Sequence, residues 1–425
     1  MYGLRNRMWS LTLLACVAST VVACKEDLDG TVGCPSLCPE QNVVSRDTLL
    51  ETFATVDTAV VGYPVLGTEA FLLVASRGDT LDARAIMRFD TLSQTFSRGN
   101  TDSTIYSVDS SMVTVRLDTT GTKATQPVTV EIYDVDTAVV DTATSAALAL
   151  FRPDRLIGGK TFAPAELKDT LRVPLENDKV LAKLVGAAPR RLRIGFRLTS
   201  SASAQIRIVA REGGVLSEIS YDPSPDTVVK SIVNSATSLT PTDNPTLRAD
   251  LTDYQLVAAG GQGGGVGNLL AVGGLPAHRT FFRFNIPSRL VDSTTVVRAT
   301  LLLTQVPTTS VDASDSLTIY PQVVRAAIEL KDVVRSAGIL NPANLEIDSL
   351  RIRPNESGQR AIEIVGAMRE WQALGPTTLQ RAIVLRSKTE GASAPVVLFY
   401  SSKAAPALRP RLRITYVNKV EFGVP

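Results

Sequence analysis

The chain has 425 residues, of which 44% are hydrophobic, only 5% are aromatic and one is histidine. At about 150 residues per domain, this length allows two or three domains. The formal net charge of +2 excludes a nucleic-acid binder that works through bulk positive charge. With His278 as its single histidine, the chain cannot build a His-rich metal site and has little room for Ser-His-Asp or Cys-His catalysis. The composition therefore indicates a non-enzymatic protein.

The first residues have the parts of an export signal. Arg5 and Arg7 precede an apolar stretch at residues 8–22, which Ser and Thr alone interrupt. Its length of about 15 residues is short of the ~20 that a permanent transmembrane helix needs. We therefore predict that residues 1–23 are a signal peptide.

The sequence Val-Val-Ala-Cys at residues 21–24 ends this signal. It resembles the lipobox of bacterial lipoproteins. That resemblance implies cleavage before Cys24, a lipid on its sulfur, and the membrane as a partner through the lipid anchor. Directly after the lipidated cysteine, an Asp favours retention in the inner membrane. Here Lys25 stands at that position, which favours the outer membrane, on its periplasmic or its surface face. The alternative is an ordinary signal peptide with a chance cysteine.

Two cysteines remain after Cys16 leaves with the signal and Cys24 takes the lipid. Cys34 and Cys38 enclose a short loop, and in an oxidising compartment a disulfide between them is the simple interpretation. Half of a zinc site is the alternative, but the chain has neither a second pair nor a nearby histidine. We predict that residues 24–46 form a lipidated tether with a small disulfide loop.

From about residue 46 onward, apolar and polar residues alternate in short runs between Gly, Pro, Asp and Asn. The clearest alternating segments are residues 112–117, 128–133, 205–209, 317–320 and 411–416. A period of two is typical of half-buried antiparallel strands, and many such strands predict an all-β protein of sandwich type with a few short helices. One helical turn is expected around Trp371, where residues 361–374 read as a strand that runs into a helix.

The two halves of the chain resemble each other. Five pairs of segments match in the same order, about 190 residues apart, which suggests a tandem duplication. The pairs are residues 86–90 with 281–285, 131–133 with 318–320, 171–174 with 350–354, 203–208 with 393–398, and Tyr221 with Tyr416. We therefore predict two tandem jelly-roll-like β-sandwiches, at residues 47–222 and 236–418, joined by a linker near residues 222–226.

The second half is similar to the DNRLRE-type domain, a jelly-roll-like sandwich of secreted bacterial proteins that is related to a carbohydrate-binding family. Three segments carry the resemblance: residues 280–303, residues 362–371 and residues 401–416. The family's Trp-rich central segment is missing here. The resemblance covers roughly residues 236–418 and implies a β-sandwich with polysaccharide as one class of partner.

Signatures of chemistry are sparse. The chain contains neither a G-x-S-x-G elbow nor an S-x-x-K motif, and we expect His278 to be an exposed loop histidine. Asp-Thr dipeptides recur in the first half and are typical of turns. Calcium is the one cofactor that these carboxylates suggest, with Asp134 and Asp136 as the only close pair.

Five residues are candidate ligand contacts. Trp371 and Tyr400 are aromatic side chains that a sugar would stack on. Arg409, Arg411 and Arg413 alternate along a predicted strand and so form a positive stripe. Such a stripe either guards an edge strand against aggregation or binds an acidic glycan or a lipopolysaccharide phosphate.

These features predict a lipid-anchored cell-envelope protein with a structural or protein-interaction role. A polysaccharide-binding surface lipoprotein is the alternative, and an enzyme is the third hypothesis. The expected partners are the membrane and either an envelope protein or a polysaccharide, with no nucleic acid, metal or other cofactor.

Overall fold

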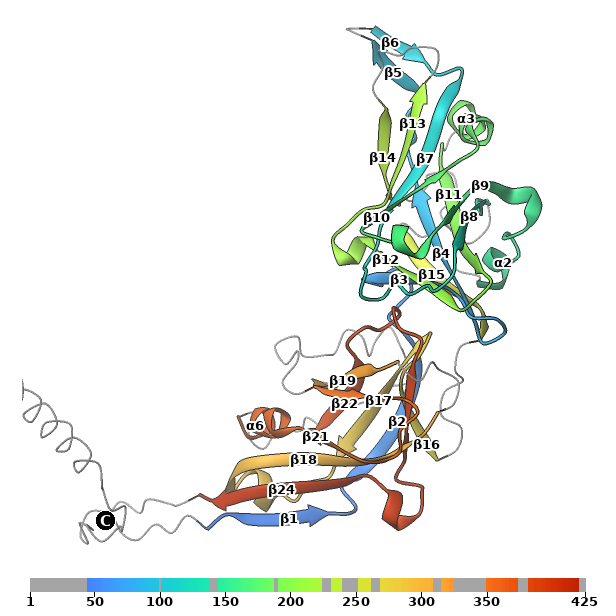
Figure 1. The fold of residues 1–425 in the computed structure, drawn as a ribbon. Coiled ribbons are helices and arrows are strands. Elements are labelled where there is room, and N and C mark those ends of the chain that lie inside the picture. The colour runs from blue at the N-terminus through green and yellow to red at the C-terminus, as the bar shows by residue number, and fades with distance from the viewer. Residues whose placement is uncertain are drawn as a thin grey trace, which may run out of the picture. The chain divides into compact units, whose positions relative to one another are not determined.

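The fold is seen in a computed structural model. It describes residues 44–98, 101–137, 144–186, 190–223, 231–238, 251–260, 268–308, 315–324, 349–373 and 381–419. By their contacts, the described residues from Arg46 onward form one compact unit. The predicted lipidation at Cys24, the predicted disulfide between Cys34 and Cys38, and most of the predicted linker fall outside the described residues. The all-β class is confirmed (Figure 1).

Two sheets and a hairpin form what we call the first lobe. Its strands are β3 (Phe71–Ser76), β4 (Leu81–Phe89), β5 (Thr95–Arg98), β6 (Thr101–Thr104), β7 (Val108–Arg116), β8 (Val128–Asp134), β9 (Leu156–Phe162), β10 (Thr170–Pro174), β11 (Leu192–Ser200), β12 (Ala204–Val209), β13 (Glu218–Pro223), β14 (Ile232–Ser235) and β15 (Asp253–Gly260). The larger sheet has the order β12-β3-β4-β11-β8-β9, and β15 pairs with the other edge of β4. The smaller sheet has the order β10-β7-β13-β14, and β5 pairs with β6.

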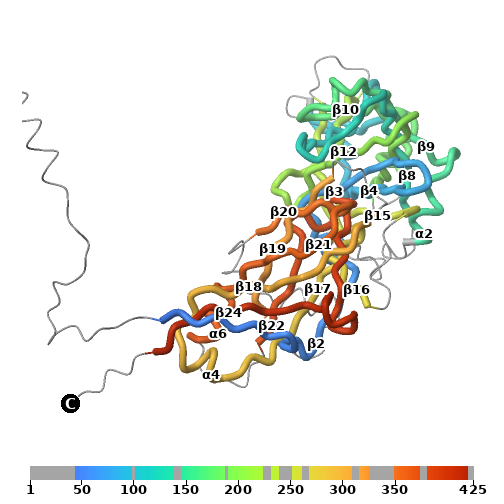
Figure 2. The backbone as a smooth tube through the Cα atoms, turned by 60° about the horizontal axis from the view of Figure 1, so that its bottom comes forward, coloured from blue at the N-terminus to red at the C-terminus, as the bar shows by residue number. Residues whose placement is uncertain are grey.

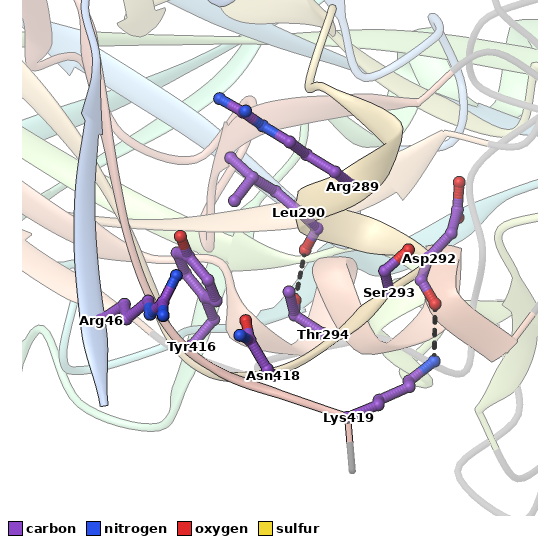
Figure 3. A pocket seen from close by; sticks show the side chains of 9 residues that line it. All are labelled: Arg46, Arg289, Leu290, Asp292, Ser293, Thr294, Tyr416, Asn418 and Lys419. Atoms are coloured by element: carbon purple, nitrogen blue, oxygen red, sulfur yellow. Dashed lines mark hydrogen bonds between the residues drawn. The ribbon is translucent and has the colours of Figure 1, made fainter. Parts of the chain in front are cut away.

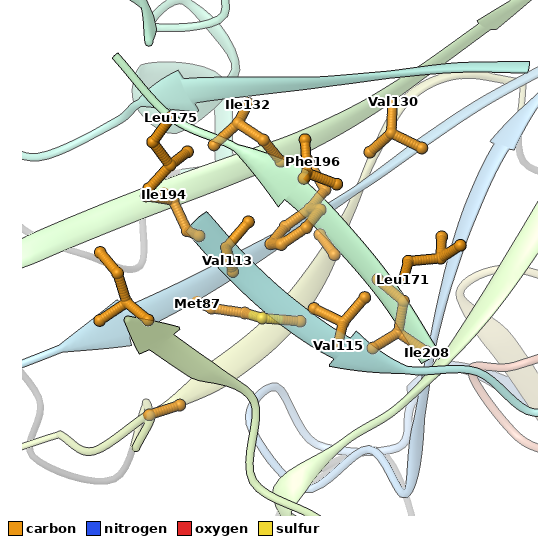
Figure 4. Packing of buried hydrophobic residues seen from close by; sticks show 14 of the residues in the cluster. Met87, Val113, Val115, Val130, Ile132, Leu171, Leu175, Ile194, Phe196 and Ile208 are labelled. Carbon is orange, nitrogen blue, oxygen red and sulfur yellow. The ribbon is translucent and has the colours of Figure 1, made fainter. Parts of the chain in front are cut away.

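The core of the first lobe lies between its two sheets. Val113 and Val115 from the smaller sheet pack in one buried cluster with Met87, Ile132 and Phe196 from the larger sheet (Figure 4). On β7 these valines are buried while Met112, Thr114 and Arg116 are partly or fully exposed, as strand alternation requires. The first lobe is therefore a β-sandwich.

The second lobe contains the remaining strands. They are β1 (Arg46–Leu50), β2 (Ala54–Tyr63), β16 (Leu269–Gly273), β17 (Ala277–Phe284), β18 (Thr294–Val306), β19 (Leu317–Val324), β20 (Leu350–Ile352), β21 (Gly358–Glu363), β22 (Ala382–Ser387), β23 (Val396–Tyr400) and β24 (Arg411–Asn418). They form one curled sheet of 11 strands, because the end of β18 also pairs with β23 over two residues. Phe282, Leu301 and Leu412 lie in its core.

Helices are few and short. They are α2 (Thr144–Leu148), α3 (Asn177–Val185), α4 (Ser288–Val291) and α6 (Val365–Ala373), with 3₁₀ turns at Pro153–Arg155, Pro164–Glu166, Arg211–Gly213 and Pro406–Leu408. The predicted passage from a strand to a helix around Trp371 is confirmed by β21 and α6. All five alternating segments named above are confirmed as strands. In the part of the chain that the structure describes, no helix is long and apolar enough to cross a membrane.

The two lobes repeat one strand order. In the first lobe, β12-β3-β4-β11-β8-β9 has the counterpart β23-β16-β17-β22-β19-β20 in the second. Likewise β10-β7-β13-β14 has the counterpart β21-β18-β24-β1. Four of the five matched segment pairs fall on strands with the same place in this order. The fifth pair, residues 171–174 and 350–354, falls on β10 and β20, which do not correspond.

The first two strands of the chain belong to the second lobe. β2 runs along the edge of β17, and β1 pairs with β24, the last strand (Figure 2). β14 and β15 hold the equivalent places in the first lobe. Even a register shift is repeated: it falls between Val257 and Ala259 on β15 and between Val61 and Tyr63 on β2.

This pairing differs from the boundaries drawn on the sequence. Those boundaries assign residues 47–63 to the first sandwich and residues 253–260 to the second, whereas each segment is hydrogen-bonded into the other lobe. The physical reason is that alternation fixes which face of a strand is buried but not which edge the strand joins. The N-terminal strands therefore close the C-terminal lobe.

Within the compact unit the lobes also meet directly. Leu275 of the turn between β16 and β17 packs in one cluster with Leu73 and Leu81 of the first lobe. Asp315, which is 5% exposed and precedes β19, pairs with Arg77 at 3.2 Å and with Lys123 at 2.9 Å. The junction thus combines an apolar contact with a buried carboxylate shared by two cations.

Candidate functional site

A polar pocket lies where the first and the last strand end. We call it the terminal pocket; it has a volume of about 760 Å³ and is open to solvent. Its lining comes from the start of β1, the end of β24 and the segment from α4 to β18. The lining residues are Arg46, Arg289, Leu290, Asp292, Ser293, Thr294, Tyr416, Asn418 and Lys419 (Figure 3).

The short helix α4 sets the shape of one wall. Pro287 precedes the helix in an extended conformation, and Leu290 and Val291 are buried in the core of the second lobe. The Thr294 hydroxyl donates a hydrogen bond to the Leu290 carbonyl at 2.7 Å, which fixes the turn from α4 into β18. Because this side of the helix faces the core, Arg289 is left on the exposed side, at the pocket.

The opposite wall is built by strand pairing. Arg46 lies directly across from Tyr416 in the pairing of β1 with β24. The two side chains lie side by side in Figure 3. Lys419 follows β24 and donates from Nζ to the Asp292 carbonyl at 2.8 Å, which ties the C-terminal segment to the α4 turn. Three cationic side chains from three separate segments therefore line one pocket.

The carboxylate of the pocket is already paired. Asp292 Oδ1 lies 3.4 Å from Nη2 of Arg381, whose Nη1 donates to the Ile286 carbonyl at 3.2 Å. Arg46, Arg289 and Lys419 thus face a pocket whose single acidic side chain is offset by a fourth cation. This excess of positive charge favours an anionic ligand.

Trp371 is not a surface aromatic. Its side chain is 4% exposed and packs from α6 into the core of the second lobe, with its ring centroid 5.2 Å from that of Phe284. A ring buried on all sides has no face for a sugar, so the prediction that it contacts a ligand is wrong. Tyr400, at the end of β23, is half-buried and pairs with Leu269 across the sheet.

The three arginines of the predicted stripe lie together, but not on an edge. β24 is hydrogen-bonded to β18 on one side and to β1 on the other, so the edge-guard interpretation is wrong. Arg411 and Arg413 point to the outer face of this sheet, opposite the buried Leu412. Arg409 precedes the strand and donates from Nε to the Ala404 carbonyl at 2.7 Å. Arg413 lies 3.7 Å from Asp47.

His278 contradicts its expected position. It lies on β17, is 1% exposed, and its Nδ1 is 3.1 Å from the Gly273 carbonyl oxygen. Burial lowers the pKa of His278, because the interior disfavours the charged imidazolium. The residue is a core histidine of the second lobe and not an exposed loop residue.

The close carboxylate pair of the first lobe is occupied by cations of the chain itself. Lys183 lies 2.9 Å from Asp134 and 3.6 Å from Asp136, and Arg191 lies 2.7 Å from Asp136. Two ammonium or guanidinium groups at these distances already neutralise the oxygens that a calcium ion would need. Among the described residues there is no group of three or more side chains that would hold a metal ion.

A buried ionic cluster holds the closing strand β2 in place. Glu390 accepts hydrogen bonds from Nε and Nη2 of Arg279 at 2.8 and 2.7 Å, and Arg386 lies 2.9 Å from the same carboxylate. The Arg279 guanidinium stacks over the ring of Tyr63 at 3.8 Å. Since Tyr63 ends β2, this cluster is a structural clamp and not a free reactive group.

Two buried carboxyl groups have raised pKa values. Glu69 is 3% exposed on the segment from β2 to β3, and burial raises its pKa to about 7. Asp253 is 3% exposed at the start of β15, and burial raises its pKa to about 6. Glu69 lies where the chain passes from the second lobe to the first, and the charge of Asp253 contributes to the raised pKa of Glu69.

Comparisons with known proteins identify no family. Protein-family models and curated proteins yield no match. A structure of infectious bursal disease virus, Gt strain, aligns over 91% of this chain and 78% of its own, with 10% identity and a TM-score of 0.14. The VP2 subviral particle of infectious bursal disease virus aligns over 88% and 76%, with 9% identity and a TM-score of 0.11. TM-scores this low carry no argument about fold or function.

Proposed function

We propose that this protein is a lipid-anchored component of a bacterial cell envelope with a structural or protein-interaction role and no enzymatic activity. The export signal and the cysteine at its end support the anchor. The similarity of the second half to the DNRLRE-type domain belongs to this proposal and supports a secreted β-sandwich body. The outer membrane is the proposed location.

One structural observation carries the proposal. The strand that follows the tether, β1, pairs over its whole length with the last strand, β24, with Arg46 opposite Tyr416 and Leu50 opposite Leu412. A load on the anchored end would therefore be received by an edge strand that is hydrogen-bonded into a continuous sheet. Such a connection suits a body that is held at a surface while it engages another molecule.

The surface of the two lobes carries ion pairs and exposed hydrophobic side chains. In the second lobe, Arg298 of β18 donates to Glu363 of β21 at 2.8 Å, and Arg413 of β24 lies near Asp47 of β1. In the first lobe, Tyr106 is 80% exposed just before β7 and Val233 is 52% exposed on β14. An aromatic and an aliphatic side chain in the open, amid polar surface, are features of protein contact surfaces.

Membrane anchoring is tested by replacing Cys24. We expect Cys24→Ser to shift the protein from the membrane fraction to the soluble fraction or to block its maturation, with loss of lipid detected by mass spectrometry. Cys16→Ser is the matched control, because it removes a thiol from the same apolar segment outside the lipobox. Continued lipid modification and membrane association of the Cys24 variant would contradict the anchor.

The interaction role is tested in intact cells. Crosslinking followed by purification is expected to recover one consistent envelope protein, and Tyr106→Ala together with Val233→Ser is expected to reduce its yield. Recovery of lipid and bulk porins alone would count against the role. Retention on a polysaccharide column, lost in the Tyr106 variant, would replace the proposal with polysaccharide binding.

A further inference from the structure

We propose that the terminal pocket binds the phosphate of an anionic phospholipid headgroup. This inference rests on the proposed membrane anchoring and gives it a second attachment point, formed by the folded body. The pocket is distinct from the Arg409–Arg413 stripe and from the aromatic residues that the sequence suggested.

The charge of the pocket defines the class of ligand. Arg46, Arg289 and Lys419 project from three segments, and the carboxylate of Asp292 is matched by Arg381. Arginine presents several N–H donors in a plane that suits phosphate oxygens, and lysine adds a compact positive charge. A phosphodiester, which is negatively charged and has two free oxygens, is therefore a ligand that these donors favour.

Size and polarity agree with a headgroup. The volume of about 760 Å³ exceeds what a bare phosphate fills and lies within the usual range of about 300–1,000 Å³ for small-molecule sites. Ser293 and Asn418 line the same space and supply neutral hydrogen-bonding groups for glycerol hydroxyls. The pocket is open to solvent, as it must be if the acyl chains remain in the bilayer.

Covalent connection keeps the pocket within reach of the anchor. Arg46, the first residue of β1, follows Cys24 by about 22 residues, which span at most about 75 Å when fully extended. A lipid on Cys24 would therefore hold the pocket in a small volume next to the bilayer, where the effective concentration of headgroups is high. Even a weak site would then be occupied.

The experiment uses the full chain, purified in a neutral maltoside detergent, and titrates soluble short-chain lipids by calorimetry. Dihexanoyl phosphatidylglycerol is the anionic probe, dihexanoyl phosphatidylcholine is the zwitterionic probe, and inorganic phosphate is the lipid-free probe. The pocket variant combines Arg46→Gln, Arg289→Gln and Lys419→Gln. The control variant combines Arg116→Gln, Lys160→Gln and Arg172→Gln, which removes the same charge from exposed positions of the first lobe.

We expect phosphatidylglycerol to bind the unmodified chain more tightly than either other probe. Each cation near a phosphate contributes about fivefold in affinity, so the pocket variant should bind about 100-fold more weakly. The control variant should bind within about twofold of the unmodified chain. Equal thermal stability of both variants would show that the loss does not come from unfolding.

Three results would overturn the inference. Equal weakening in both variants would mean that net charge alone attracts the lipid. Phosphate binding that equals phosphatidylglycerol binding would assign the pocket to free phosphate. Absence of binding to all three probes would leave the pocket without this function. The Cys24→Ser experiment measures membrane anchoring separately. It therefore distinguishes a failure of lipid binding in the terminal pocket from a failure of the lipid anchor.

Discussion

Glu69 is expected to make the protein less stable as the pH rises from acidic to mildly alkaline. Its carboxylate is 3% exposed and accepts a hydrogen bond from the Gly67 backbone N–H at 2.6 Å. Burial raises its pKa from 4.5 to about 7, and hydrogen bonds from backbone N–H groups only partly oppose this shift. The folded state therefore holds the proton more tightly than the unfolded state does.

The size of the effect follows from linkage. At about 1.4 kcal/mol per pKa unit, the raised pKa corresponds to about 3 kcal/mol of unfolding free energy. This contribution is fully present below pH 4.5 and is lost as the pH rises through about 7. Asp253, whose pKa rises from 3.8 to about 6, adds a loss of the same sign at lower pH.

The assay is urea denaturation at pH 4.5 and at pH 8. Glu69→Gln keeps the size of the side chain and removes its charge. Between pH 4.5 and pH 8, we therefore expect the unfolding free energy of the unmodified protein to fall by about 3 kcal/mol more than that of the variant. Glu218→Gln, at an exposed position of β13, is the matched control and should follow the unmodified protein. If the loss of unfolding free energy between the two pH values differs by under about 1 kcal/mol between Glu69→Gln and the unmodified protein, burial does not raise the pKa of Glu69 as stated.

Three further substitutions test the packing. Phe196→Ala, in the core of the first lobe, should lower the unfolding free energy by about 3–5 kcal/mol in urea denaturation; a loss below about 1 kcal/mol would contradict a packed core. Glu390→Gln leaves Arg279, 5% exposed, without its paired charge and should cost about 3–5 kcal/mol, seen as a lower melting temperature; an unchanged melting temperature would argue against the clamp. Gly260→Ala should destabilise β15 by more than about 1 kcal/mol, because φ is +77° and the new Cβ would overlap the Thr80 carbonyl oxygen; faster amide exchange in β15 would register it, and unchanged exchange would oppose it.

The candidate pocket is a product of tertiary structure. Arg46, Arg289 and Lys419 are far apart in the sequence and carry no common motif, so sequence reasoning missed them. Tyr416 was singled out, but as a repeat match with Tyr221 and not as a pocket residue. The pocket depends on the pairing of β1, the first strand, with β24, the last strand, because this pairing brings Arg46 beside the C-terminal segment.

The aromatic and histidine assignments failed for a related reason. Trp371 and His278 have amphipathic side chains that occur both in cores and on surfaces, so residue type leaves their burial open. Trp371 is buried because α6 packs against the core of the second lobe. His278 is buried on β17, which lies inside the sheet between β2 and β22. The paired segments are far apart in the sequence.

The sequence by itself determined that the protein is all-β, where its clearest strands lie, and that its two halves match. These properties are local, because alternation with a period of two marks a strand with one buried face wherever that strand ends up. Only the tertiary structure decided that β1 and β2 close the C-terminal lobe and that β15 joins the N-terminal one. Backbone hydrogen bonds are the same for every strand, so the choice of neighbour depends on which sheet edge the folded chain brings within reach.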